Sequence, residues 1–116
     1  MRKSLTKEER LKRQTDINRV FAERKRVTCY GAKLVYRENG LPRNRMTVTL
    51  VRKYGNAVKR NRAKRVVREA YRELKASLKT GFDMVIILYP SEDTYWNRMQ
   101  QLQKLFARAA LSTENG

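Results

Sequence analysis

Residues 56–78 repeat apolar and basic side chains at helical spacing, and this pattern restricts the fold more than any other part of the chain. At about 100° per residue, the apolar residues share one helix face and most basic residues share the opposite face. Asn56 belongs to the residue types that favour the N-cap position. The apolar face holds Ala63, Val66, Val67, Ala70, Tyr71, Leu74 and Leu78, and the basic face holds Arg60, Asn61, Lys64, Arg65, Arg68, Arg72 and Lys75.

Three cations crowd the start of this helix, where electrostatics disfavours them. Lys59, Arg60 and Arg62 closely follow Asn56, yet the helix dipole is positive at its N-terminus. A local rule broken so plainly suggests a function. Because free backbone N–H groups and cations at a helix N-terminus together bind phosphate groups, we predict a phosphate-binding site here. We call it the helix-start site (Lys59, Arg60 and Arg62).

The net charge indicates a polyanionic partner. The 116 residues include 28 Lys and Arg against 11 Asp and Glu, a formal charge of +17. Such self-repulsion costs stability in the free protein and implies RNA, DNA or an anionic membrane surface. We expect no membrane partner, because the longest apolar run, 84–89, cannot span a bilayer and the N-terminus lacks a signal-peptide core. The single cysteine, Cys29, fits a reducing cytoplasm and is expected to be a small buried residue.

The composition argues against catalysis by protein side chains. Histidine is absent, which excludes Ser-His-Asp triads, Cys/His zinc sites and histidine acid–base chemistry. Asp16, Asp83 and Asp93 are far apart in sequence, and the glutamates mostly stand among Lys and Arg at helical spacing, as surface pairs do. We therefore expect no catalytic residue, no metal site and no cofactor on the protein itself.

The chain is expected to form one domain over residues 1–116, because it shows no repeat, linker or composition break. Residues 1–13 are expected to be a loosely ordered basic arm, although Thr6 and Glu9 could close a capping-box turn, and 112–116 a tail. Between them, the periodicity predicts an α+β sandwich of one sheet and its helices, ordered αβββαβα or with one strand fewer. The predicted elements are helices over 15–24 (capped by Thr15), 56–79 and 92–111, and strands over 27–38 (with a potential break at Gly31), 45–52 and 82–89.

The last predicted helix carries an apolar stripe that should face the core. Tyr95 and Trp96 are expected as core anchors rather than as platforms on which bases stack. The stripe consists of Trp96, Met99, Leu102, Leu105, Phe106 and Ala109.

A motif after the strand over 45–52 resembles the signature of a known family. Gly55-Asn56-Ala57-Val58 is followed by Arg60-Asn61-Arg62, Lys64-Arg65 and Arg68-Glu69. This string resembles the signature of the bacterial ribonuclease P protein subunit. The resemblance covers nearly the whole chain and extends to Asp16-Ile17, Val20-Phe21, Tyr36 and residues 83–88.

The resemblance implies an αβββαβα fold with a left-handed crossover through the basic helix, although general rules favour a right-handed one. It also implies a ribonucleoprotein whose large RNA catalyses removal of the 5′ leader from precursor tRNA. Mg²⁺ is then expected in the RNA-containing holoenzyme, because RNA can hold ions that keep their waters. The protein alone would be inactive and cytoplasmic, and its partners would be the RNA subunit and precursor tRNA, with no required protein partner.

The resemblance further implies two binding surfaces. The leader would lie in a cleft between the first helix and the sheet, and aromatic faces beside cations do hold single strands. Ile17 stands where many family members have phenylalanine, and Val51 where serine is common, which removes one stacking surface and one hydroxyl. The RNA-subunit surface would comprise Lys53, Asn56, Lys59, Arg60, Asn61, Arg62, Lys64, Arg65 and Arg68, and the leader cleft Ile17, Phe21, Lys33, Tyr36, Thr49 and Arg52.

Several alternatives remain open at the level of sequence. Phe21 and Tyr36 fit the core as well as a cleft. A structural ribosomal-type RNA-binding protein with no processing role would carry the same charge. The string Arg60-Asn61-Arg62 and the aromatic pair Phe21 and Tyr36 favour the ribonuclease P subunit over this alternative. An autonomous nuclease lacks histidine and clustered carboxylates, and a DNA-binding protein is disfavoured because helix-turn-helix spacing is absent.

Overall fold

A four-stranded sheet forms the centre of the structure, a computed structural model that describes residues 6–113. β2 runs antiparallel to β1 and β4, whereas β3 runs parallel to β4, so the sheet is mixed. β4 lies between two neighbours and is a near-continuous apolar run, as expected of a strand buried on both faces. The order across the sheet is β1 (Arg26–Cys29), β2 (Ala32–Glu38), β4 (Phe82–Leu88) and β3 (Arg45–Leu50).

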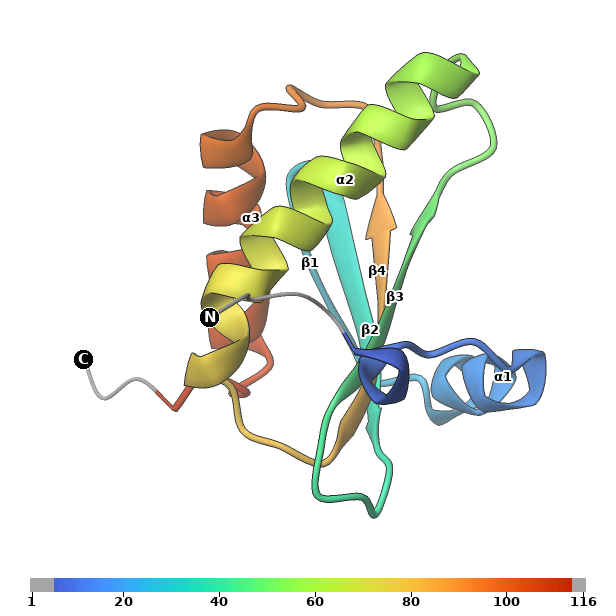
Figure 1. The fold of residues 1–116 in the computed structure, drawn as a ribbon, viewed down its shortest axis with the longest axis vertical. Helices are drawn as coiled ribbons and strands as arrows, with labels where there is room; N and C mark the ends of the chain where they lie inside the picture. The colour runs from blue at the N-terminus through green and yellow to red at the C-terminus, as the bar shows by residue number, and fades with distance from the viewer. Residues whose placement is uncertain (1–5, 114–116) are drawn as a thin grey trace.

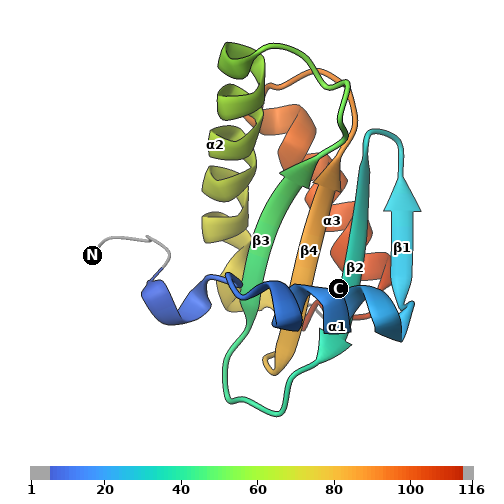
Figure 2. The same cartoon turned by 90° about the vertical axis from the view of Figure 1, so that its right-hand side faces the viewer.

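The connection from β3 to β4 passes through α2 (Ala57–Leu74) and is left-handed. Figure 2 shows both strands pointing up, with β4 to the right of β3 and α2 behind the sheet. Seen from the α2 side with the strands pointing up, the chain therefore moves to the left on passing from β3 to β4. This crossover is the exception to the right-handed rule, and the structure confirms the prediction taken from the resemblance.

Three helices cover the two faces of the sheet unequally (Figure 1). α2 and α3 (Tyr95–Arg108) pack on one face, and α1 (Gln14–Glu23) crosses the other. The main core lies under α2 and α3, whereas the α1 face holds a small cluster. Burial of apolar area drives folding, so most of the hydrophobic stabilisation comes from the α2 and α3 side. The small cluster consists of Leu11, Val20, Val35 and Val85.

The fold class and element order agree with the sequence prediction. The potential break at Gly31 separates β1 from β2 as a tight hairpin. Gly31 has φ of +84°, and a Cβ there would lie 2.6 Å from Gln101 Nε2, so this turn requires glycine. α1 begins at Gln14 with Arg13 at the N-cap, so the prediction of Thr15 as the cap is wrong. α2 ends at Leu74, and one turn of 3₁₀ helix follows.

The structure places residues 6–13, part of the predicted loosely ordered arm, against the edge of β3. The capping box of Thr6 and Glu9 closes a short 3₁₀ turn, as predicted. Beyond it, the Leu11 amide donates to Met46 O at 3.0 Å, and the Leu11 side chain is only 2% exposed. Glu9 also pairs with Lys75 at 3.2 Å. One buried leucine and the open edge of β3 therefore hold the arm, and residues 1–5 lie outside the described part.

The start of α3 corrects the prediction for its aromatic residues. Trp96 is 67% exposed and Tyr95 is also exposed, so neither is a core anchor. The reason is that Arg98 and Gln101 are buried. These two polar residues rotate the buried face of α3 away from Trp96, whereas a purely apolar criterion assigns them to solvent. Among the described helices, none is long and apolar enough to cross a membrane.

Candidate nucleic-acid interface

The start of α2 presents an unusually basic helix N-terminus. Asn56 is the N-cap, and its side chain accepts a hydrogen bond from the Lys59 amide at 2.9 Å, as predicted. The first turn contains no acidic residue. Lys59 and Arg62 are exposed, so their charges add to the positive end of the helix dipole. The cations of the first turn therefore oppose the helix dipole and do not stabilise the helix.

Arg60 has a different local role from its neighbours. Its guanidinium Nη1 donates to the carbonyl of Val51 at 3.2 Å and, at 3.4 Å, to that of Arg52. The side chain thereby ties the helix start to the preceding loop, which carries the exposed Arg52 and Lys53. Arg60 therefore positions part of the basic surface as well as contributing charge to it.

The structure brings together all nine residues predicted for the RNA-subunit surface. They lie on α2 and on the loop immediately before it, and their side chains are mostly exposed. Arg60 and Lys64 are half-buried because they flank the apolar face of the helix. The exposed members are Lys53, Asn56, Lys59, Asn61, Arg62, Arg65 and Arg68.

The second predicted surface is on the face of the sheet that carries α1. Figure 2 shows α1 crossing the lower part of the strands, while no helix covers their upper part. Lys33 on β2 and Thr49 on β3 are both in register with Ile87 on β4, so the three residues form one row across the sheet beyond α1. Phe21 projects from α1 and is 44% exposed. We call this surface the open face (Phe21, Lys33, Thr49 and Ile87).

Tyr36 does not belong to the open face, which corrects the predicted cleft. Its ring packs against the main core and lies edge-on to Phe82, with ring centroids 6.3 Å apart. Side chains alternate between the two faces of a strand, so Lys33 and Tyr36, three residues apart on β2, point in opposite directions. The period of a strand, applied to these two residues, would have revealed the conflict. Ile17, in contrast, is a residue of α1 that is partly buried against the small cluster between α1 and the sheet.

Ion pairs attach α1 to the sheet. Arg45 on β3 donates through Nη2 to Asp83 at 2.7 Å and through Nη1 to Asp16 of α1 at 3.4 Å. The hydrogen bonds with Asp83 raise the pKa of Arg45, so the guanidinium stays charged. A weaker pair joins Arg37 to Glu23 at 3.8 Å. These directional contacts fix the angle at which α1 crosses the sheet, and so the size of the open face.

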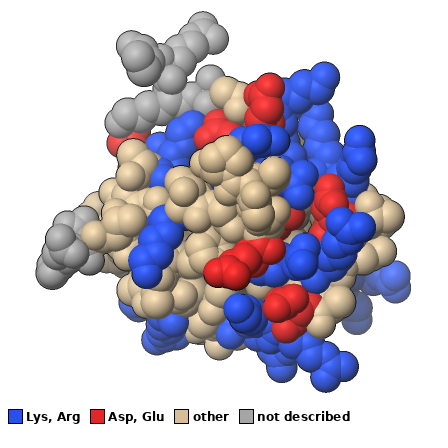
Figure 3. Space-filling model, turned by 90° about the horizontal axis from the view of Figure 1, so that it is seen from below, with Lys and Arg blue, Asp and Glu red and all other residues tan. Residues whose placement is uncertain are grey.

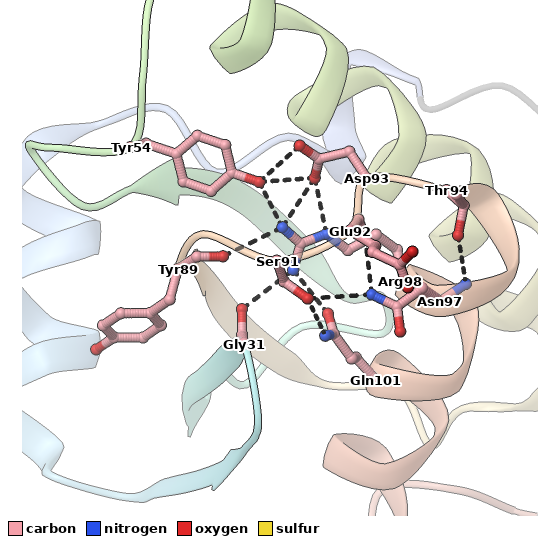
Figure 4. Close-up of polar contacts among 10 residues, drawn as sticks. All are labelled: Gly31, Tyr54, Tyr89, Ser91, Glu92, Asp93, Thr94, Asn97, Arg98 and Gln101. Atoms are coloured by element: carbon pink, nitrogen blue, oxygen red, sulfur yellow. Dashed lines mark hydrogen bonds and ion pairs between the residues drawn. The ribbon is translucent and has the colours of Figure 1, made fainter.

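A buried arginine, which the sequence analysis missed, holds the loops beside the helix-start site (Figure 4). Arg98 of α3 is 0% exposed. Its guanidinium donates to the Tyr54 hydroxyl, to Asp93 Oδ1 at 2.8 Å and to the carbonyls of Gly31 and Tyr89. Three loops, from β1 to β2, from β3 to α2 and from β4 to α3, therefore meet at one side chain.

Tyr54 links this network to the basic surface. Its hydroxyl donates to Asp93 Oδ1 at 2.6 Å, and its ring is buried in the main core. Burial, together with the hydrogen bond to Asp93, raises the pKa of Tyr54 to about 12. Because Tyr54 follows Lys53 directly and precedes the N-cap Asn56 by two residues, its anchoring fixes the backbone from which the basic loop projects.

Charge is distributed unevenly over the rest of the surface. Seen from below, Lys and Arg side chains crowd the side that carries α1, whereas the centre of this face is largely uncharged (Figure 3). In the described residues, no cluster of three or more carboxylate or cysteine side chains is placed to hold a metal ion. Cys29 is half-buried, and burial raises the pKa of its thiol, which disfavours the nucleophilic thiolate.

Sequence comparison finds relatives over most of the chain. A family model described as Ribonuclease P matches residues 5–110. The chain is 38% identical over 87 residues to the ribonuclease P protein component of Thermotoga maritima, covering 75% of this chain and 74% of that protein. It is 32% identical over 116 residues to the protein of the same name from Caldanaerobacter subterraneus, covering 98% and 97% of the two chains.

Comparison with solved structures finds the same architecture. The RNase P protein from Thermotoga maritima superimposes with a TM-score of 0.77 at 31% identity, covering 86% of this chain and 96% of that chain. An RNase P protein from Staphylococcus aureus gives a TM-score of 0.80 at 22% identity, covering 90% and 97% of the two chains. The second likeness concerns the fold alone.

Proposed function

The chain belongs to the ribonuclease P protein family, and from this premise we propose that its two basic surfaces bind two different RNAs. The surface at the start of α2 binds the RNA subunit, and the open face binds the 5′ leader of precursor tRNA. The observation that carries the proposal is the cluster of exposed cations around a helix N-terminus that lacks acidic residues. Both the helix dipole and the cations at this helix start favour the binding of phosphate groups.

We further propose that catalysis belongs to the RNA subunit. The protein would act by neutralising RNA phosphates and by adding contacts to the leader. The Mg²⁺ ions of the reaction would be held within the RNA-containing assembly, because octahedral Mg²⁺ keeps several waters and often binds through phosphates. Purified protein freed of RNA should then leave precursor tRNA intact, and cleavage by such a preparation would contradict the assignment.

The RNA-subunit surface is tested by the salt dependence of binding. Arg62→Gln and Arg65→Gln each remove one exposed cation without touching the core. Each should make the slope of log affinity against log salt shallower by about 0.7–0.9, the effect of one lost phosphate contact. Lys104→Gln on α3 removes an equal charge next to β1, at the far edge of the sheet, and should keep the parental slope. Equal slopes for the parental protein and all three variants would refute the assignment of the RNA-subunit surface.

The leader surface is tested by the ratio of affinities for precursor and mature tRNA. Mature tRNA has no leader, so loss of a leader contact lowers the ratio. Phe21→Ala should weaken precursor binding by roughly 1–3 kcal/mol if the ring stacks on a base. Tyr36→Leu is the matched control, because Tyr36 lies on the opposite face and should lower thermal stability without changing the ratio. A change with Tyr36→Leu alone would reverse the assignment of faces.

A further inference from the structure

Asp16 is a carboxylate on α1, the helix that borders the open face. Its side chain is 15% exposed, and it pairs with Arg45 of β3 at 3.4 Å and with Arg19 of α1 at 3.5 Å. A carboxylate repels the phosphates of RNA, so it weakens any surface that binds RNA directly. A carboxylate beside the proposed leader surface therefore contradicts the chemistry of that surface, which indicates a role other than contact with RNA.

Arg45, the partner of Asp16 on the sheet, is held in a defined orientation by buried groups. Its Nε and Nη2 donate to the two carboxylate oxygens of Asp83, at 2.8 Å and 2.7 Å. Asp83 is only 1% exposed, and Asn39 Nδ2 donates to its Oδ1 at 2.9 Å. A bidentate pair of this kind fixes the plane of the guanidinium. The remaining nitrogen, Nη1, donates to Asp16 on α1.

Apolar packing alone orients α1 poorly. Within this helix, which the structure describes in full, Val20 is the only buried residue. A helix with a single buried contact can swing about it, because the hydrophobic effect is not directional. A second ion pair, between Arg37 and Glu23, is longer at 3.8 Å and more exposed. The direction of α1 across the sheet therefore depends mainly on the contact between Asp16 and Arg45.

The direction of α1 decides where Phe21 stands over the open face. Phe21 lies five residues beyond Asp16, about 7.5 Å along the helix. The other members of the open face, Lys33, Thr49 and Ile87, belong to strands and do not move with α1. Binding sites require their contact groups to be held within about 0.5 Å by supporting residues. Asp16 supplies this support to Phe21.

We propose that Asp16 is a positioning residue for the 5′ leader. It acts through Arg45, which transmits the fixed orientation of the buried Asp83 carboxylate to α1 and so to Phe21. Leader bases then meet a preformed surface and do not have to order α1 on binding, which removes an ordering cost from association. The inference rests on the proposed function of the open face, and it assigns Asp16 no contact with RNA.

The sign of the effect separates positioning from charge. Asp16→Ala makes the protein more positive, so charge alone would tighten the binding of precursor and mature tRNA together. Positioning predicts that the ratio of precursor to mature affinity of the reconstituted holoenzyme falls roughly two- to fivefold, as expected for one partly exposed ion pair. Asp16→Asn keeps an oxygen acceptor for Arg45 and should fall between Asp16→Ala and the parental protein. An unchanged or raised ratio in folded Asp16→Ala would overturn the proposal.

Glu38→Ala is the matched charge control. Glu38 is exposed at the end of β2, and its replacement removes the same charge without touching α1. The precursor-to-mature ratio of this variant should equal the parental ratio. A fall as large as that of Asp16→Ala would show that charge, and not the position of α1, sets the ratio.

A double-mutant cycle with Phe21 tests the route by which Asp16 acts. Asp16→Ala should lower the ratio in the parental background but not in the Phe21→Ala background, because its effect passes through the ring. Residual dipolar couplings of the α1 amides in the free protein should also shrink relative to those of the sheet, since the helix then swings. Additive effects on the ratio, or parental couplings in Asp16→Ala, would overturn the positioning role.

Failure of this inference is distinct from failure of the proposed function. If Phe21→Ala lowers the ratio and Asp16→Ala does not, the open face binds the leader and only the positioning role is wrong. If neither variant lowers the ratio, the open face does not bind the leader and both claims are wrong. Thermal melting of each variant above the assay temperature confirms that the folded proteins are compared.

Discussion

Replacement of Arg98 by methionine should destabilise the protein severely. The guanidinium is fully buried and donates to Asp93, to Tyr54 and to the backbone carbonyls of Gly31 and Tyr89. Methionine fills a similar volume but leaves the Asp93 carboxylate without its cation. Breaking a buried ion pair in this way costs about 3–5 kcal/mol. A domain of this size has about 5–15 kcal/mol of unfolding free energy in total, so the variant keeps only part of it.

Urea denaturation followed by circular dichroism measures this loss directly. Arg108→Met is the matched control, because Arg108 is exposed and donates only to the Thr28 carbonyl among described residues. It should cost no more than about 0.5 kcal/mol. In a double-mutant cycle, Arg98→Met and Tyr54→Phe should be non-additive by about 0.5–3 kcal/mol, since they share one network. A cost below about 1 kcal/mol for Arg98→Met would refute the reasoning.

The same network should matter for binding as well as for stability. Tyr54→Phe keeps the buried ring and removes only the hydroxyl that Arg98 and Asp93 hold. The loop that carries Lys53 should then be less ordered in the folded protein, and RNA-subunit affinity should fall at a temperature where the variant is fully folded. Parental affinity in folded Tyr54→Phe would show that the network supports the fold alone.

Three further predictions concern charge and pH. Asn56→Asp retains the N-cap and adds a negative charge at the helix start, so urea denaturation should show about 0.3–1 kcal/mol of added stability while RNA binding weakens. Burial alone would raise the pKa of Glu9, but the Thr6 amide and Lys75 lower it on balance from its ordinary 4.5. Glu9 therefore stabilises the docked arm above that pH and ceases to as the pH falls through its lowered pKa. The protection factor of the Leu11 amide, its exchange rate relative to that of an unstructured amide at the same pH, should then fall in acid in the parental protein but not in Glu9→Gln. The raised pKa of Tyr54 means that its stabilisation is complete below pH 10 and is lost toward pH 12, so Tyr54→Phe should flatten the alkaline stability profile.

Local periodicity was sufficient to predict α2. Its buried residues are those that fall on one side of a helix at 100° per residue, because a single continuous element packs against a single sheet face. Asn56 was also predictable as the N-cap, since capping depends on atoms within three residues. The start of the basic surface follows from these two facts alone, which explains why all nine predicted RNA-subunit residues lie together.

Contacts between distant segments could not be predicted in the same way. Arg98 is buried because Gly31, Tyr54 and Asp93 approach it from three loops, and nothing in the sequence around residue 98 reports their positions. The docked arm is similar, because the single apolar residue Leu11 gives no periodic signal. The wrong assignment of Tyr36 to the cleft differs from the cases of Arg98 and the arm. Strand alternation alone places Tyr36 and Lys33 on opposite faces of the sheet, so this error was avoidable from the sequence.

The unequal faces of the sheet explain how this small domain combines stability with an open face. The main core uses the face under α2 and α3, and the left-handed crossover places α2 on this face. Among the described residues, the cluster on the other face has only four buried apolar members, because ion pairs through Arg45 and Asp83 also hold α1 in place. The row of Lys33, Ile87 and Thr49 is thus left without a covering helix. Since α2 begins at the same end of the strands as this row (Figure 2), an RNA strand bound to the open face as proposed would pass close to the helix-start site.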